Sequence, residues 1–231
     1  MNGTLALVGS GEYLPPMDRV DRWLLERLPG PARVVCLPTA AGREGAERLG
    51  YWSRLGVDHF TRLGAQAEAV EIIDHATAEE EALASRVRAA NFVYLSGGDP
   101  SHLYHTLKGT RAWAAIESVL QQGGVVAGCS AGAIIFSERF PSFPTFLQWY
   151  PAFNYLPGAV IFPHYDEFGD GWMGRLGQTL APRGLTVLGV EGNTALVAYD
   201  GRHEVRGSGG VTVWNRQRKE RLVEGQPVSW P

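Results

Sequence analysis

Short apolar runs alternate with amphipathic stretches over the first 130 residues of the chain. The runs are rich in Val, Leu and Ala and end in glycine or proline, which is typical of strands buried on both faces. The stretches between them place apolar residues at helical spacing. The predicted strands are 5–8, 33–38, 67–73, 91–95 and 124–127, and the predicted helices are 16–28, 43–63, 77–89 and 112–122. This alternation predicts an α/β fold with a mostly parallel central sheet flanked by helices.

The pattern changes beyond residue 136. Residues 137–157 are rich in Pro and aromatic side chains without a clear period, which predicts a long ordered loop with a short helix. Thereafter we expect strands at 158–162 and 186–191, a helix at 171–180, a hairpin that begins at 194–199, antiparallel strands within 205–214 and a solvated charged edge at 216–221. C-terminal antiparallel strands therefore follow the parallel sheet. Because no linker-like segment interrupts the chain, we expect one domain over residues 1–231.

Composition narrows the possible partners and location. The chain has 231 residues, a formal net charge of −3 and 19% charged residues, so neither nucleic acid nor an acidic membrane surface is an expected partner. No apolar run approaches the roughly 20 residues that span a bilayer, and the N-terminus lacks the features of a signal peptide. The two cysteines, Cys36 and Cys129, are too few for a disulfide framework. We therefore expect a cytoplasmic protein.

The segment 124–136 carries the strongest chemical signal. A β-branched run leads into Gly128-Cys129-Ser130-Ala131-Gly132 and then into a small-residue helical start. This is the layout of a nucleophile elbow, in which a strained strand-to-helix turn raises one side chain above the sheet. We predict Ser130 as the nucleophile and expect Cys129 to point back towards the sheet. The N–H of Ala131 is positioned to hold an oxyanion.

A second glycine-rich loop, Ser96-Gly97-Gly98-Asp99, follows the predicted strand 91–95. Ligands gather at the carboxyl ends of parallel strands, so Gly98 is a candidate second oxyanion donor and Asp99 a candidate substrate-binding residue. A plain turn before a helix capped by Ser101 is the alternative. The loop 9–12, after the first strand, is expected to line the same edge of the sheet.

A serine hydroxyl needs a base, and histidine is the usual one. Among the six histidines, His164 combines a strand end with a preceding proline, and His102 is the reserve candidate. The base needs a carboxylate to fix its tautomer. Glu191 and Asp166 are the two candidates, and Asp166 is also a candidate substrate-binding residue. No metal-ligand spacing is present.

These residues resemble the S51 serine peptidases, the group of peptidase E (aspartyl dipeptidase) and cyanophycinase. The resemblance rests on Gly97-Gly98-Asp99, the elbow 128–133, Pro163-His164-Tyr165 and Gly189-Val190-Glu191-Gly192-Asn193, in the family's order over residues 5–200. It implies a fold like class I glutamine amidotransferases, a Ser130–His164–Glu191 triad, no cofactor and often a homodimer. The amidotransferase arrangement would instead favour Asp166 as the orienting carboxylate.

The resemblance implies a peptidase acting on a small peptide substrate, as a dipeptidase with possible Asp-X specificity. Recognition of an N-terminal Asp needs a cation, for which Arg43, Arg139 and Arg175 are candidates, although the aromatic loop 140–155 departs from the family pattern. One alternative is a cyanophycinase-like exopeptidase on β-Asp-Arg units, with Asp166, Glu167 and Asp170 as an acidic patch. The other is a non-catalytic binding protein on an amidotransferase-like scaffold.

Overall fold

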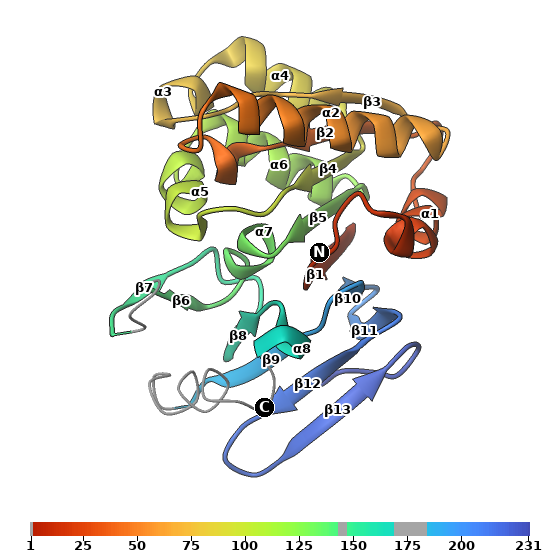
Figure 1. Cartoon of the computed structure of the whole chain (residues 1–231), viewed down its shortest axis with the longest axis vertical. Helices are drawn as coiled ribbons and strands as arrows, with labels where there is room; N and C mark the ends of the chain where they lie inside the picture. The colour runs from red at the N-terminus through yellow and green to blue at the C-terminus, as the bar shows by residue number, and fades with distance from the viewer. Residues whose placement is uncertain (1, 143–146, 169–183) are drawn as a thin grey trace.

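A seven-stranded sheet forms the centre of the computed structural model, which describes residues 2–142, 147–168 and 184–231 (Figure 1). The strand order is β11-β10-β1-β5-β4-β2-β3, and the five strands from β1 to β3 in that order run parallel. The parallel strands are β1 (Thr4–Val8), β2 (Arg33–Leu37), β3 (Gln66–Ala69), β4 (Phe92–Leu95) and β5 (Val125–Cys129). Strands β10 (Thr194–Tyr199) and β11 (Arg202–Gly207) extend the sheet antiparallel.

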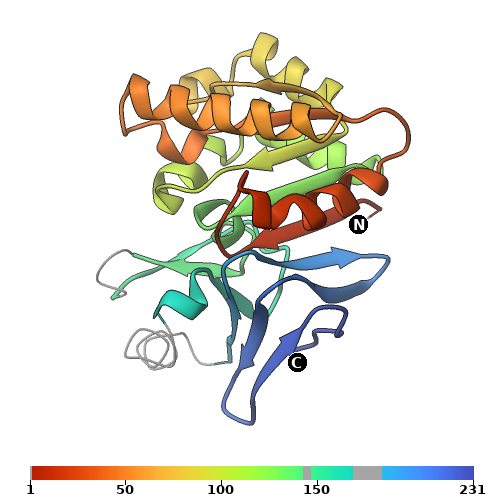
Figure 2. The same cartoon turned by 45° about the vertical axis from the view of Figure 1, so that its right-hand side comes forward.

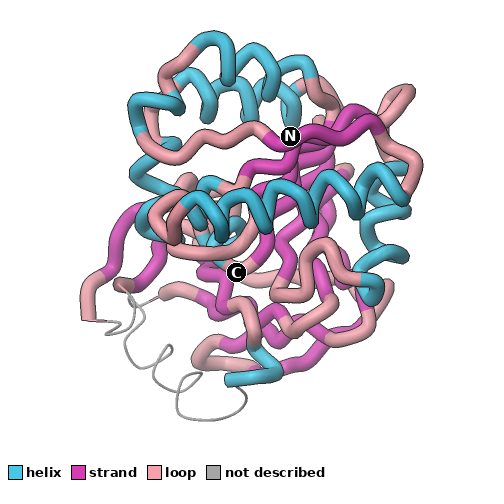
Figure 3. Tube along the Cα trace, turned by 45° about the horizontal axis from the view of Figure 1, so that its top comes forward, coloured by secondary structure: helices cyan, strands magenta, loops and turns pink. Residues whose placement is uncertain are grey.

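Helices cover both faces of this sheet (Figure 2). The helices are α1 (Asp18–Glu26), α2 (Ala46–Arg62), α3 (His75–Ala78), α4 (Glu81–Ala89), α5 (Pro100–Leu107), α6 (Arg111–Gln121) and α7 (Ala131–Ile134). One more described helix, α8 (Tyr165–Phe168), follows β8 and packs against the second sheet. Two short 3-10 helices, Pro15–Met17 and Thr39–Ala41, lie in the loops after β1 and β2. In the tube view, the helices enclose the strands on both sides (Figure 3).

Alternate residues of the central strands enter two different apolar clusters. Leu5 and Leu7 of β1 pack in the cluster that includes the apolar residues of α4, α5 and α6. Ala6 and Val8, their neighbours, pack in the cluster beneath α1 and α2. Because strand side chains alternate between faces, a strand covered on both sides is apolar at every position. This explains the continuous apolar runs in the sequence.

A second sheet lies beside the first, in the order β13-β12-β9-β8. Its strands are β8 (Ala159–Phe162), β9 (Thr186–Val190), β12 (Gly210–Trp214) and β13 (Lys219–Val223). Strands β8 and β9 are parallel, and the other two pairings are antiparallel. The α/β fold class, with a mainly parallel central sheet flanked by helices and C-terminal antiparallel strands, is therefore confirmed. None of the described helices is long and apolar enough to cross a bilayer.

Two predicted elements differ in the structure, and a third lies outside the described residues. The helix predicted over 77–89 is divided into α3 and α4, and α3 is capped by Asp74, whose carboxylate accepts from Thr77 N at 2.8 Å, rather than by Thr77. The strand predicted over 67–73 is shorter, because β3 ends at Ala69. The predicted helix 171–180 lies outside the described residues.

The aromatic segment was predicted to be a loop with a short helix, and its described residues differ. They form a hairpin of β6 (Arg139–Pro141) and β7 (Trp149–Pro151). Aromatic side chains stabilise it by cross-strand contact, since the rings of Phe140 and Tyr150 lie 5.7 Å apart. The charged segment 216–221 leads into β13, which is an exposed edge strand, as the solvated-edge prediction requires.

Close packing at the end of β5 makes a stability prediction. A Cβ at Gly128 would lie 2.2 Å from the carbonyl oxygen of Gly132, so the turn between β5 and α7 would have to shift. We expect Gly128→Ala to lower the free energy of unfolding by about 1–3 kcal/mol, measured by denaturant titration. Gly50→Ala is the matched control, because its Cβ meets only the flexible end of Arg54 within 4 Å. Equal stability of the two variants would contradict this packing.

Candidate active site

Three loops meet at the carboxyl ends of neighbouring parallel strands. The loop after β1 contains Glu12, the loop after β4 contains Gly97 and Gly98, and β5 ends at Cys129, directly before Ser130. Strand β5 lies between β1 and β4, so the two other loops flank Ser130. Open α/β sheets bind ligands at this edge.

Ser130 occupies a strained turn between β5 and α7. Its φ is +50° and its ψ is −108°, a region that residues with a Cβ rarely adopt. Its N–H donates to the carbonyl of Val8, and its own carbonyl accepts from Ala133 and Ile134. The flanking glycines permit the turn, since a Cβ at Gly132 would lie 2.5 Å from the Leu95 carbonyl oxygen. The sequence thus folds here into a strained strand-to-helix turn with Ser130 at its tip.

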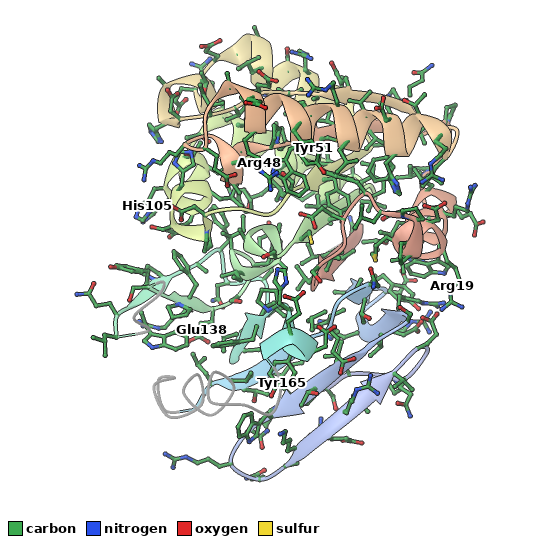
Figure 4. The ribbon with its side chains drawn as sticks, viewed as in Figure 1. Arg19, Arg48, Tyr51, His105, Glu138 and Tyr165 are labelled. Carbon is green, nitrogen blue, oxygen red and sulfur yellow. The ribbon has the colours of Figure 1, made fainter. Side chains whose placement is uncertain are left out.

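His164 approaches Ser130 from the second sheet. It follows β8 and also has a positive φ, +52°. Its Nε2 lies 3.1 Å from Ser130 Oγ, within hydrogen-bonding distance. The next residue anchors this position: Tyr165 is buried and packs on Gly189, where a Cβ would lie 2.3 Å from the ring (Figure 4).

The carboxylate on the other side of this imidazole is Glu167. Its Oε1 lies 3.1 Å from His164 Nδ1, and Glu167 is one helical turn further along the chain. Glu191, the carboxylate that the family resemblance implies, accepts from Arg221 and from Gly210 N–H, because β12 and β13 lie beside β9 and bring these donors to it.

Asp166, the alternative orienting carboxylate, binds backbone instead. Its Oδ1 accepts from Gly192 N–H at 2.8 Å. The same turn pairs with the loop after β1, since Ser10 and Gly192 form a β-bridge and Asn193 N–H donates to the Ser10 carbonyl. Asp166 therefore ties α8 to the loop that follows β9, and this loop to the first sheet.

The Gly97–Gly98 loop packs directly against the elbow. A Cβ at Gly97 would lie 3.3 Å from Ser130 Cβ, and one at Gly98, where φ is +141°, would lie 2.5 Å from the Ala40 carbonyl oxygen. Gly98 N–H makes no hydrogen bond to the described residues. Asp99 caps α5 by accepting from Ser101 and His102 N–H through Oδ1, so this residue, rather than Ser101, is the cap.

Cys129 points back into the core, as expected. Its thiol is buried and lies 2.9 Å from Glu12 Oε2. Burial, and then the nearby Glu12 carboxylate, raise the pKa of this thiol well above its usual value. The neutral thiol is a poor nucleophile, so burial makes Cys129 a poor candidate for the nucleophile of this turn.

His102, the reserve candidate for the base, lies in α5, after the Gly97–Gly98 loop. Its Nε2 is near Gly42, and burial followed by the charge of Arg43 lowers its pKa. Of the candidate cations, Arg43 is exposed before α2, Arg139 begins β6, and Arg175 lies outside the described residues. No group of three or more potential metal ligands occurs in the described part of the chain.

Comparison with known proteins agrees with this geometry. The model of peptidase family S51 matches residues 5–206. The chain belongs to peptidase family S51. The resemblance drawn from the sequence is therefore confirmed, and membership makes the chain a serine-type peptidase, which is a hydrolase.

Individual relatives give the same result. The crystal structure of a peptidase from an acI-B1 Actinobacterium is 32% identical, with a TM-score of 0.89 over 100% of this chain and 98% of that one. A structure assigned to peptidase E from Listeria monocytogenes EGD-e, 21% identical, shares the fold, with a TM-score of 0.63 over 89% of this chain and 98% of that one. The uncharacterized peptidase Lmo0363 of Listeria monocytogenes is 27% identical over 58% of this chain and 66% of its own length.

The sequence reasoning did not predict the contacts of three residues at this S51 site: Glu12, Glu167 and Arg221. Glu12 stands in a glycine-rich loop at the carboxyl end of a parallel strand, and this position is a signal that the sequence provides. Glu167 lies three residues after His164, which would be a signal once a helix is expected there. Arg221 had no signal, because its contact with Glu191 depends on the pairing of β13 with β12.

The buried thiols give a chemical prediction. Burial raises the pKa of Cys36 to about 12 and that of Cys129 well above its usual value, so both remain protonated at pH 8. We expect neither thiol of the native protein to react with Ellman's reagent at pH 8, and both to react in guanidinium chloride. Iodoacetamide should leave hydrolysis unaffected. Rapid reaction of either thiol in the native protein would contradict the burial of that cysteine.

Proposed function

We propose that this chain is a cytoplasmic, dipeptidase E-like serine peptidase that hydrolyses short peptides. The hydrogen bond between Ser130 Oγ and His164 Nε2, 3.1 Å long, carries the proposal. It joins a hydroxyl on an elbow to an imidazole. These two groups are the nucleophile and the general base that acyl transfer to serine requires. Family membership supports a peptide bond as the one that is cleaved.

The mechanism follows from the positions of these groups. His164 Nε2 takes the proton of Ser130 Oγ as this oxygen attacks the scissile carbonyl carbon. The N–H groups of Gly98 and Ala131 stabilise the oxyanion. As the C–N bond breaks, His164 returns the proton to the leaving amine. His164 then takes a proton from water, whose oxygen attacks the ester carbonyl. As the bond between this carbon and Ser130 Oγ breaks, His164 gives the proton to Oγ and the acid is released.

The orienting carboxylate is proposed to be Glu167, which accepts from His164 Nδ1 and so presents Nε2 to Ser130. Glu191, the residue that the family resemblance implies, is the alternative. Its carboxylate is hydrogen-bonded to Arg221. The two assignments make opposite predictions for substitution.

Substrate binding is proposed to involve Asp99 and Asp166. Each uses Oδ1 for backbone N–H groups, which leaves Oδ2 to accept from the free α-amino group of a dipeptide. Both residues lie close in sequence to the reacting groups. A protein carboxylate that binds the α-amino end of the substrate would favour exopeptidase over endopeptidase action.

We also propose how many domains and subunits the protein has. One domain over residues 1–231 is supported by the largest apolar cluster, which includes Leu95 of the first sheet and Leu188 of the second. A homodimer is proposed from the family resemblance alone. Analytical ultracentrifugation of the chain measures its oligomeric state.

The function is tested with labelling and a substrate panel. We expect a fluorophosphonate probe to label the wild-type chain, and Ser130→Ala to abolish labelling and lower kcat by at least roughly 1,000-fold. The panel holds Asp-X dipeptides, other dipeptides and β-Asp-Arg, with cleavage of Asp-X or other dipeptides expected. Cleavage of β-Asp-Arg alone would indicate the cyanophycinase-like alternative. Full activity of Ser130→Ala would refute the proposed nucleophile.

A paired substitution separates the two carboxylates. Glu167→Gln is expected to lower kcat by roughly 100-fold, because the imidazole loses the partner that fixes its tautomer. Glu191→Gln serves as the control, because it keeps the acceptor for Gly210 N–H; its kcat should stay within about threefold of wild type. Measurement is by steady-state kinetics on the best dipeptide of the panel. The reverse order of effects would assign the role to Glu191.

A further inference from the structure

Glu12 is a buried carboxylate beside the nucleophile that the proposed mechanism does not use. It is 8% exposed and stands in the loop that follows β1. Both of its oxygens have partners: Oε1 accepts from Gly97 N–H at 3.0 Å, and Oε2 lies 2.9 Å from Cys129 Sγ. Burying a carboxylate is costly unless it is hydrogen-bonded. The two contacts of Glu12 offset this cost and join the carboxylate to two neighbouring segments of the site.

The loop that carries Glu12 is anchored by its neighbour. Tyr13 is 3% exposed and has a φ of +64°, an unusual value for an aromatic residue. Its ring packs 4.8 Å from that of Tyr94 and 6.1 Å from that of Phe60, in the core beneath α2. The inward turn of Tyr13 leaves Glu12 directed at the edge of the sheet that carries Ser130.

The contact with Gly97 constrains the glycine loop. A Cβ at Gly97 would lie 2.9 Å from Glu12 Oε1 and 3.3 Å from Ser130 Cβ, so the three groups are in close contact. Oε1 of Glu12 accepts from the N–H of Gly97. The next N–H, that of Gly98, has no hydrogen-bond partner among the described residues. Glycine has the freest backbone of all residues, and two in succession need an external constraint to hold one orientation.

We propose that Glu12 is a positioning residue that holds the Gly97–Gly98 loop in register with Ser130. Its carboxylate bridges the loop after β4 to the end of β5, through Gly97 N–H and the Cys129 thiol. The bridge keeps Gly98 N–H at a fixed distance from the carbon that Ser130 attacks. This inference rests on the proposed function, since it concerns the same oxyanion site.

Substitution of Glu12 tests the proposal. Glu12→Ala should lower kcat and the second-order rate of fluorophosphonate labelling by about 100-fold, the usual effect of a misplacement near 1 Å, with KM within about threefold. Glu12→Gln should restore both to within about fivefold of wild type, because an amide oxygen also accepts from Gly97 N–H. Glu12→Asp, too short to bridge, should behave like Glu12→Ala and replaces it if the alanine variant does not fold.

Asp21→Ala is the matched control. Asp21 is a fully buried carboxylate paired with His59 at 2.8 Å, on α1 and outside the site. We expect this variant to have a lower melting temperature and unchanged labelling and kcat. Equal labelling losses in Asp21→Ala and Glu12→Ala would overturn the proposal, as would a Glu12→Gln variant as slow as Glu12→Ala, or a folded Glu12→Ala with wild-type rates. Failure of the wild-type chain to label would instead refute the proposed function itself.

Discussion

The hydrogen bond between Ser130 and His164 crosses from one sheet to the other, and the arrangement of the site depends on it. Ser130 is fixed by β5, which is held between β1 and β4 in the parallel sheet. His164 is fixed by β8 and by the packing of Tyr165 on Gly189 in the second sheet. The distance between the two side chains therefore depends on how the sheets meet. Apolar residues of both sheets share one core cluster, which makes that relationship rigid.

Backbone strain is concentrated where the chemistry is proposed. Ser130, His164 and Tyr13 all have positive φ values although none is glycine. Such conformations cost of order 1–3 kcal/mol each and persist only where the surroundings over-determine them. Here the surroundings are specific: glycines that let α7 approach the sheet, a tyrosine ring against Gly189 and another in the core under α2. Each strained residue directs a side chain, its own or its neighbour's, towards one edge of the sheet.

Carboxylates surround this edge, and their contacts differentiate them. Glu167 contacts the imidazole, Asp166 a backbone N–H of the loop after β9, Glu191 an arginine, and Glu12 the glycine loop together with a thiol. Acids of similar chemistry thus hold different parts of the site in place. Their different partners explain why several acidic groups lie at this one edge of the sheet.

The pattern along the chain was enough to predict the α/β class, the approximate positions of the parallel strands and the tight turn at Ser130, because strand periodicity and glycine spacing are local properties. It also indicated family S51. Contacts between distant segments were beyond its reach. The hairpin at 139–151 has no alternation that periodicity can detect, and the split of 77–89 depends on the capping of a single turn by Asp74. Which carboxylate meets His164 was decided only by tertiary structure, because the pairing of β13 with β12 brings Arg221 to Glu191, and one turn of helix leaves Glu167 beside the imidazole.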